Sequence, residues 1–197
     1  KQLPELLKNP LLIALYAVTV FMATGYYASY SYIEPFLAQV AHVDAGAITM
    51  TLTAFGCSGL LGSWLFGRLF DGHRFPFLAI TLSGVPVALL LMGPAASSLV
   101  TVLAVCALWG CCATAFNVAF QAELIKHTPA DSSAVAMSIF SGLFNLGIGT
   151  GTAIGGAVVS GPGIVWIGFV GGAIAVVGVI LAITVLFPAI RRAKPVA

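Results

Sequence analysis

Two tyrosines and a carboxylate recur at helical spacing near residue 30. Tyr27, Tyr30 and Glu34 lie three and four residues apart, so a helix places them on one stripe. Ser31 lies beside this stripe and adds a hydroxyl. Pro35 disfavours helical geometry at Glu34, so we expect the helix to bend or stop there and to free backbone groups near the acid. Together these groups offer hydrogen bonds and aromatic faces, which is the chemistry of a pathway for a small polar solute.

Two further groups of polar side chains repeat at the same spacing later in the chain. They are Thr114, Asn117 and Gln121 in one run, and Ser138, Ser141 and Asn145 in another. On a helix, each group shares one face. These faces can line a cavity, or they can make interhelical hydrogen bonds worth about 0.6 kcal/mol each, and the two uses are compatible. Thr114, Asn117, Gln121 and Asn145 therefore join the candidate pathway.

The elements that position these groups must cross a membrane. Apolar residues make up 60% of the chain and charged residues 7%, and the mean hydropathy is +1.08. A soluble domain needs far more polar surface. At about 20 residues for each span, the 197 residues hold six helices and little else. We predict an all-α polytopic membrane protein, a single bundle over residues 1–197 with spans at about 11–33, 47–67, 75–92, 99–122, 134–159 and 164–187.

The basic residues predict the orientation of this bundle. All eight lysines and arginines fall on one side of a six-span arrangement, and the other three connections contain none. The eight are Lys1, Lys8, Arg68, Arg74, Lys126, Arg191, Arg192 and Lys194. By the positive-inside rule both termini are cytoplasmic, and Glu34 then lies at the outer interface. Topology explains these residues, and a net charge of +2 is too small to indicate a nucleic-acid partner.

Catalysis and metal binding have few candidate residues. The histidines, His42, His73 and His127, fall in the predicted connections, and the cysteines lie inside apolar runs without the spacing of a metal or redox site. Glu34 is the only carboxylate that the predicted spans can include, and no titratable residue falls at the bilayer centre. We therefore predict no enzyme activity, no cofactor and no metal. We expect the titratable group of any ion coupling on another polypeptide segment.

Small residues predict close packing between helices. Gly59, Ser63 and Gly67 are spaced four residues apart in the second span, and Gly151 and Gly155 have the same spacing in the fifth. Such pairs of small residues let helix backbones approach closely in lipid. We predict that they pack helices, and glycine-rich helices can in addition slide or bend during a conformational cycle.

Two stretches and one turn carry a resemblance to a known family. The stretches are residues 30–36 and residues 140–145 with their glycine-rich continuation, and the turn is residues 67–74. The turn resembles the Gly-x-Leu-x-Asp signature of the major facilitator superfamily, although Gly72 stands where a basic residue is expected. Over nearly its whole length the chain resembles the C-terminal six-helix half of such a transporter. The most similar group is the bacterial sugar efflux transporters within the drug–proton antiporters.

The resemblance implies a partner and a function. It implies that an N-terminal six-helix half precedes Lys1 and that solute is held between the two halves near the midplane. It implies proton-coupled efflux of sugars or similar small polar solutes across the bacterial inner membrane. Multidrug efflux and a self-pairing, non-transporting membrane scaffold are the alternatives. The polar start without an initiating methionine favours a fragment of a longer protein, and we expect that this half alone does not transport.

The resemblance also assigns a role to the turn after the second span. Gly67, Arg68, Asp71 and Arg74 form its signature residues. We expect Asp71 and the arginines beside it to hold the cytoplasmic ends of spans two and three against a partner.

Overall fold

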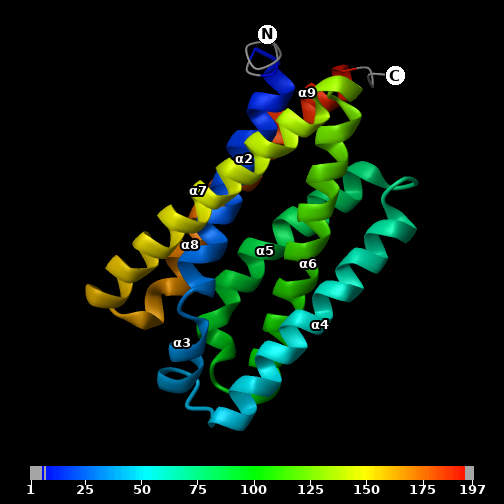
Figure 1. Ribbon diagram of the computed structural model, residues 1–197. Coiled ribbons are helices and arrows are strands. Elements are labelled where there is room, and N and C mark those ends of the chain that lie inside the picture. Colours follow the sequence, from blue (N-terminus) through cyan, green and yellow to red (C-terminus); the bar gives the residue numbers. More distant parts are fainter. Residues whose placement is uncertain (1–5, 7, 194–197) are drawn as a thin grey trace.

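The chain folds into long helices (Figure 1). The computed structural model describes residue 6 and residues 8–193, and no strand occurs within them. The α-helices are α2 (Pro10–Tyr30), α3 (Ile33–Gln39), α4 (Ala45–Leu69), α5 (Arg74–Ala95), α6 (Leu99–Lys126), α7 (Ser133–Ser160), α8 (Ile167–Leu181) and α9 (Phe187–Arg192). Short 3-10 turns, η1 (Ala130–Ser132) and η2 (Ile164–Trp166), precede α7 and α8, and a π-helical segment, η3 (Ala182–Leu186), joins α8 to α9. In the described part of the chain, six stretches are long and apolar enough to cross a membrane, which confirms the predicted fold class.

Polar residues fix where two of the spans begin. The Asn9 side chain accepts a hydrogen bond from the Leu11 amide at 3.0 Å, and Pro10 occupies the first helical position of α2. The Asp44 carboxylate accepts a hydrogen bond from the Ala47 amide at 3.0 Å and caps α4. These caps satisfy amides that have no partner inside the helix, and proline at the first position loses no hydrogen bond.

The first span breaks ahead of the predicted position. α2 ends at Tyr30, residues 31 and 32 form a turn, and α3 begins at Ile33. The prediction of a break at Glu34 is therefore wrong. Pro35 lies in the first turn of α3, where an amide has no intrahelical acceptor, so its missing N–H costs nothing there. Because the break lies between Tyr30 and Glu34, the predicted stripe is not one continuous helical face.

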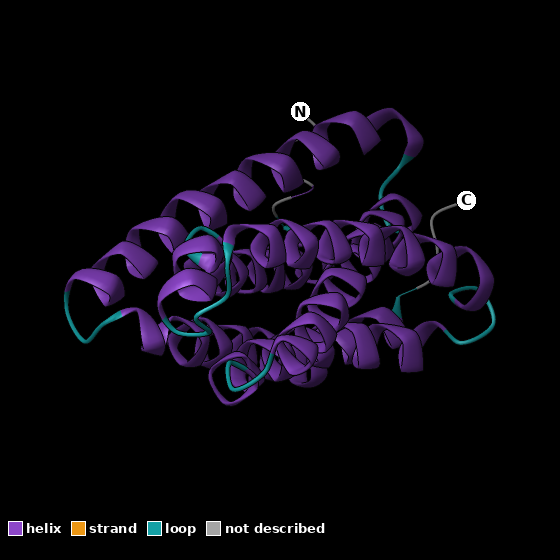
Figure 2. Ribbon diagram, turned by 90° about the horizontal axis from the view of Figure 1, so that it is seen from below, coloured by secondary structure: helices purple, strands orange, loops and turns teal. Residues whose placement is uncertain are grey.

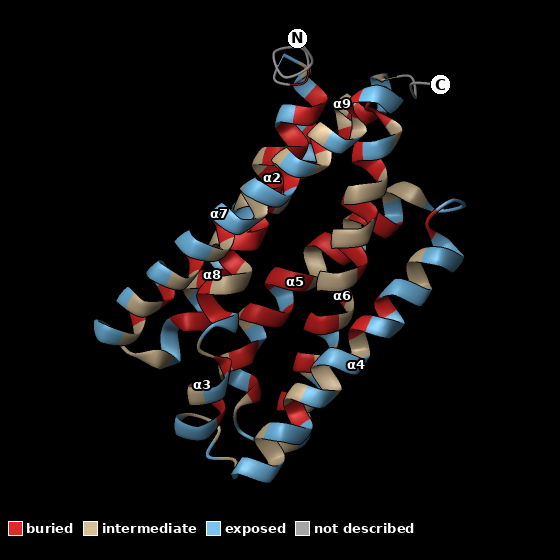
Figure 3. Ribbon diagram, viewed as in Figure 1, coloured by how far each residue is buried: buried red, intermediate tan, exposed pale blue. Residues whose placement is uncertain are grey.

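The spans pack as two groups of three. α2 packs between α7 and α8, α6 packs between α4 and α5, and α5 joins the groups by packing along α8 (Figure 1). Figure 2 shows the helices of this bundle from below. α4 and α7 occupy the outer positions. Only 17% of the most apolar stretch of α4 and 22% of that of α7 is buried, against 67% for the first span (Figure 3). Because α6 and α7 make few contacts with each other, the two groups diverge on the face between α4 and α7.

Glycines on α7 allow its close contact with α2. A Cβ atom at Gly151 would collide with the carbonyl oxygen of Thr24, and one at Gly155 would lie 2.7 Å from the Tyr32 ring. Any side chain at either position would therefore push the two helices apart. Close backbone approach through small residues is the usual way in which helices associate in lipid.

The corresponding contact of α4 differs from the predicted one. A Cβ at Gly59 would lie 2.7 Å from Thr114 Oγ1, and one at Gly62 would collide with the carbonyl oxygen of Cys111 on α6. Ser63 is exposed. The second small residue against α6 is therefore Gly62, and packing through Gly59 together with Ser63 stays a prediction. The angle at which α4 crosses α6 decides whether the third or the fourth residue faces the partner helix, and spacing alone does not fix that angle.

Candidate functional site

The two ends of the bundle differ in charge. Arg68, Arg74, Lys126, Arg191 and Arg192 lie at one end, which we call the basic end. The opposite end carries the connections at residues 40–44, 96–98 and 161–163, which contain no lysine or arginine.

A cavity of about 340 Å³ lies between α2, α6 and α7. This volume is at the lower end of the range for small-molecule sites, about 300–1,000 Å³. Its wall consists of Ala23, Tyr26, Tyr27, Ala113, Thr114, Phe116, Asn117, Gln121, Met137, Phe140, Ser141, Phe144 and Asn145. None of these described residues carries a charge. The wall therefore combines neutral hydrogen-bonding groups with aromatic surface.

Five of the eight predicted pathway residues line this cavity. They are Tyr27, Thr114, Asn117, Gln121 and Asn145. α2, α6 and α7 bring them together from positions that are far apart in the sequence. The helical spacing on α6 explains why Thr114, Asn117 and Gln121 share the wall.

The other three predicted pathway residues lie outside the cavity wall. The Tyr30 ring packs against Phe55 of α4, with ring centroids 5.4 Å apart. The Ser31 hydroxyl lies 2.8 Å from that of Thr152 and so ties the end of α2 to α7. Glu34 is exposed on α3. The turn after α2 redirects the last two residues, which is why the uninterrupted stripe expected from the sequence does not form.

The amide side chains of the wall are oriented by their own helices. Asn145 Nδ2 donates to the carbonyl oxygen of Ser141 at 2.8 Å, and a carbonyl only accepts, so Oδ1 is left as an acceptor. Gln121 Nε2 lies 2.6 Å from Asn117 Oδ1. Whichever amide donates in this pair, one NH₂ group and one carbonyl oxygen remain for a ligand. The wall therefore offers both donors and acceptors.

Tyr26 is a wall residue that sequence analysis missed. Its ring centroid lies 5.1 Å from that of Tyr30 and 5.1 Å from that of Trp109, which is fully buried. Its neighbour Tyr27 meets Phe144 of α7 edge to face at 6.1 Å. Consecutive residues on a helix point about 100° apart, so both tyrosines can border one cavity. The position of Tyr26 directly before Tyr27 could therefore have indicated a second wall residue. Sequence analysis chose Tyr27 and not Tyr26 because only Tyr27 has helical spacing to Glu34.

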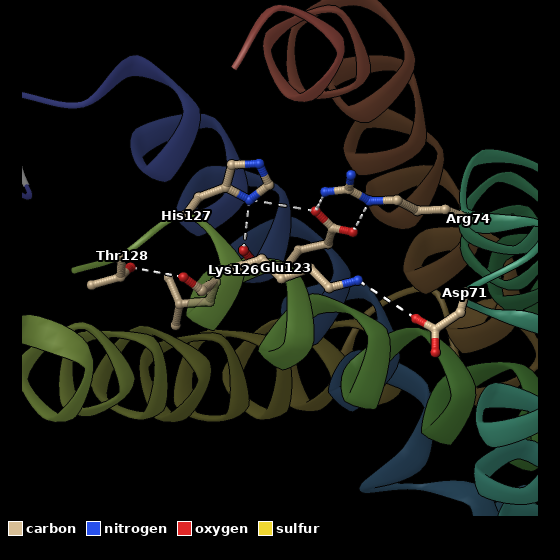
Figure 4. Close-up of polar contacts among 7 residues, drawn as sticks. Asp71, Arg74, Glu123, Lys126, His127 and Thr128 are labelled. Atoms are coloured by element: carbon tan, nitrogen blue, oxygen red, sulfur yellow. Dashed lines mark hydrogen bonds and ion pairs between the residues drawn. The ribbon is translucent and has the colours of Figure 1, made fainter. Parts of the chain in front are cut away.

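A buried charged cluster lies at the basic end, away from the cavity. Arg74 Nε and Nη2 donate to the two carboxylate oxygens of Glu123, whose side chain is only 1% exposed (Figure 4). His127 Nδ1 lies 2.9 Å from the Glu123 carbonyl oxygen and 3.6 Å from its carboxylate. The pair joins the start of α5 to the end of α6.

The acidic member of this cluster lies inside a span, where sequence analysis did not place it. The predicted fourth span ended at about residue 122 and left Glu123 outside it, yet α6 continues to Lys126 and buries Glu123. His127 follows the last residue of α6, in the connection where the sequence placed it, and it is buried. Glu123 continues the buried stripe of Phe116 and Phe120 at helical spacing, which is the signal that could have placed it inside the span.

The signature turn contacts α6 within this chain. Asp71, whose side chain is 94% exposed, lies 3.6 Å from Lys126 Nζ (Figure 4). Arg68 lies over the Trp64 ring at 5.6 Å, and a Cβ at Gly67 would meet nothing within 4 Å. The predicted contact of this turn with a partner therefore stays a hypothesis, whereas Arg74 is engaged by Glu123.

No group of three or more potential metal ligands occurs in the described part of the chain.

Comparison with family models matches residues 15–197 to the model described as Major Facilitator Superfamily. The match covers all six spans except the start of the first.

Proposed function

The chain belongs to the major facilitator superfamily, a family of membrane transporters, and on this premise we propose that it is one half of a secondary transporter for sugars or similar small polar solutes. The cavity between α2, α6 and α7 is the part of the solute site that this half contributes. The observation that carries the proposal is its uncharged wall of hydroxyls, amides and aromatic rings.

The hydrogen-bonding groups favour a polyhydroxyl solute. Asn145 Oδ1 needs a donor, and the Asn117–Gln121 pair needs one donor and one acceptor. A hydroxyl group supplies both. Tyr27 and Phe144 offer faces for the apolar C–H surface of a sugar ring. An anion lacks the donors, and a lipophilic cation finds no carboxylate on this wall, so the same groups argue against multidrug efflux.

A second six-helix half is the proposed partner. Ser141 and Asn145 are exposed on α7, and α7 and α4 are the least buried spans. An amide that faces lipid forgoes hydrogen bonds that water or protein would supply. A partner half that covers the face between α4 and α7 removes this cost and closes the cavity between two repeats, as alternating access requires. A scaffold has no use for an enclosed polar wall.

Orientation and coupling complete the proposal. The basic end is placed in the cytoplasm of a bacterial inner membrane, with both termini on that side, because the lysines and arginines of the described residues lie there. The direction is efflux driven by proton entry. Since the described cavity wall contains no titratable carboxylate or imidazole, the group that takes up the coupling proton at membrane depth is assigned to the partner half.

Transport kinetics of wall variants test this function. Asn145→Ala in the full-length protein should raise the half-saturating concentration of a labelled monosaccharide roughly 5- to 150-fold, because one buried polar contact is worth about 1–3 kcal/mol. The matched control is Ser138→Ala on the same helix, whose hydroxyl bonds Ala134 outside the wall and whose loss should change the value about twofold or less.

The outcome also separates the alternatives. Equal kinetics for the two variants, at unchanged membrane abundance, would remove the cavity from the transport pathway. Transport of a lipophilic cation without transport of the monosaccharide would favour multidrug efflux. No transport of either probe by the intact protein would favour the scaffold.

A further inference from the structure

The buried histidine at the basic end has a ring nitrogen with no hydrogen bond. The His127 side chain is 2% exposed and lies beside Glu123 at the end of α6. Its Nδ1 contacts the carbonyl oxygen of Glu123 at 2.9 Å (Figure 4). Its Nε2 is buried and has no hydrogen-bond partner among the described residues. A buried polar atom without a partner calls for an explanation.

The Glu123 carbonyl oxygen that faces Nδ1 determines which nitrogen of the His127 ring can bind a further proton. A carbonyl oxygen only accepts, so Nδ1 donates to Glu123, and in the neutral ring Nε2 keeps its lone pair. A protonated imidazole carries a hydrogen on both ring nitrogens. Nε2 is therefore the atom of His127 that takes up a proton.

We propose that His127 Nε2 is a proton-binding site at the basic end, and that a proton bound there loosens the Arg74–Glu123 pair. In the neutral cluster one guanidinium faces one carboxylate. Protonation places a second cation, with Nδ1 3.6 Å from Glu123 Oε2, beside the same carboxylate. Arg74 and His127 then compete for one anion.

The bound proton also creates a new requirement. The Nε2–H group is a donor for which the described residues offer no acceptor. A buried donor without an acceptor is destabilising, so water must reach it. Both effects favour an arrangement in which the end of α6 separates from the start of α5.

The other charged and titratable groups at this end have their own contacts. Lys126 of α6 pairs with Asp71 at 3.6 Å, where solvent reaches both. Arg191 of α9 lies over an aromatic ring at 4.9 Å, Tyr16 of α2 donates to a backbone carbonyl, and Asp131 of η1 accepts a hydrogen bond from a neighbouring serine. Among the described residues, Glu123 is the charged group at ion-pair distance from His127. The competition therefore centres on its carboxylate.

The site adds a regulated contact to the proposed transporter, and its place in a transport cycle rests on that proposed function. Proton binding at the basic end separates the start of α5 from the end of α6, which Arg74 and Glu123 join. The proton binding itself needs no solute and can be measured alone.

Nitrogen-15 spectra of His127 provide the first test. The full-length protein is labelled at histidine, and the His127 signal is assigned by its loss in His127→Asn. Before acidification the single ring hydrogen should lie on Nδ1, and acidification should add a second hydrogen on Nε2. A hydrogen on Nε2 before acidification, or a spectrum that acidification leaves unchanged, would overturn the assignment.

Distances between spin labels provide the second test. Labels replace Ile80 on α5 and Ile125 on α6, both of which are exposed. Acidification should shift the distance distribution to longer values. The shift should vanish in His127→Asn, which keeps a donor for the Glu123 carbonyl but does not titrate. It should persist in the matched control His73→Gln, because His73 is exposed in the adjacent turn.

Removal of the Glu123 charge completes the test. Glu123→Gln should give long distances at both pH values, because it removes the anion that holds Arg74. A shift that survives in His127→Asn, or that disappears in His73→Gln, contradicts the proton site. These results do not depend on any solute. They therefore fail independently of the sugar kinetics of Asn145→Ala, on which the proposed function depends.

Discussion

The Arg74–Glu123 pair should show strong energetic coupling when its members are removed one at a time. Arg74→Met leaves the Glu123 carboxylate, 1% exposed, without a counter-charge. Breaking a buried ion pair in this way costs about 3–5 kcal/mol. Because the Arg74 side chain is 24% exposed, water can partly replace it, and we expect the lower end of that range.

The reverse single variant should be milder and the double variant milder still. Glu123→Gln leaves a guanidinium that can turn towards solvent, so we expect a loss of about 1–3 kcal/mol. Arg74→Met combined with Glu123→Leu replaces both charges with apolar groups of similar size. Such exchanges are often neutral or stabilising, so the double variant should be more stable than Arg74→Met alone.

Reversible unfolding of the full-length protein in mixed detergent–lipid micelles at constant pH measures these differences. The control is Arg68→Met, because Arg68 is exposed and lies over an aromatic ring, and it should change the free energy of unfolding by about 0.5 kcal/mol or less. If Arg74→Met is no more destabilising than Arg68→Met, the pair does not hold α5 to α6. If the double variant is no more stable than Arg74→Met alone, the burial argument is refuted even if both single variants are destabilised.

Two further predictions concern packing and orientation. Gly151→Ala should destabilise the protein by about 1–3 kcal/mol, because its Cβ collides with the Thr24 carbonyl oxygen. The control is Gly149→Ala, whose Cβ meets nothing within 4 Å. Equal unfolding free energies for the two variants would contradict the close α2–α7 contact. On a cysteine-free background, an impermeant thiol reagent added to intact cells should label Gly161→Cys but not Arg192→Cys, and labelling of position 192 alone would reverse the proposed orientation.

The membrane class and the helical fold followed from the sequence because both depend on local properties. An average composition with 60% apolar residues excludes a soluble surface wherever the helices lie. Spans of about 20 apolar residues are visible without knowing their neighbours. The shared face of Thr114, Asn117 and Gln121 followed in the same way, because residues on one helix keep their spacing whatever packs against them.

Local spacing failed where the backbone left the regular helix or where a neighbour decided the contact. The turn after Tyr30 removed Ser31 and Glu34 from the predicted stripe. The crossing of α4 over α6 selected Gly62 in place of Ser63 as the packing residue. The spacing of those residues determines neither the turn nor the crossing angle.

The cavity and the charged cluster were decided by tertiary structure alone. Tyr27, Asn117 and Asn145 lie on three helices, and only the packing of α2, α6 and α7 places them around one cavity. Arg74 and Glu123 are 49 residues apart, and each looks like the polar edge of a span when its own neighbourhood is considered. A charge remains buried only where an opposite charge meets it. The spacing of Glu123 after Phe116 and Phe120 indicates the buried face of α6, but only the packing of α5 supplies Arg74, the opposite charge that stabilises the carboxylate there.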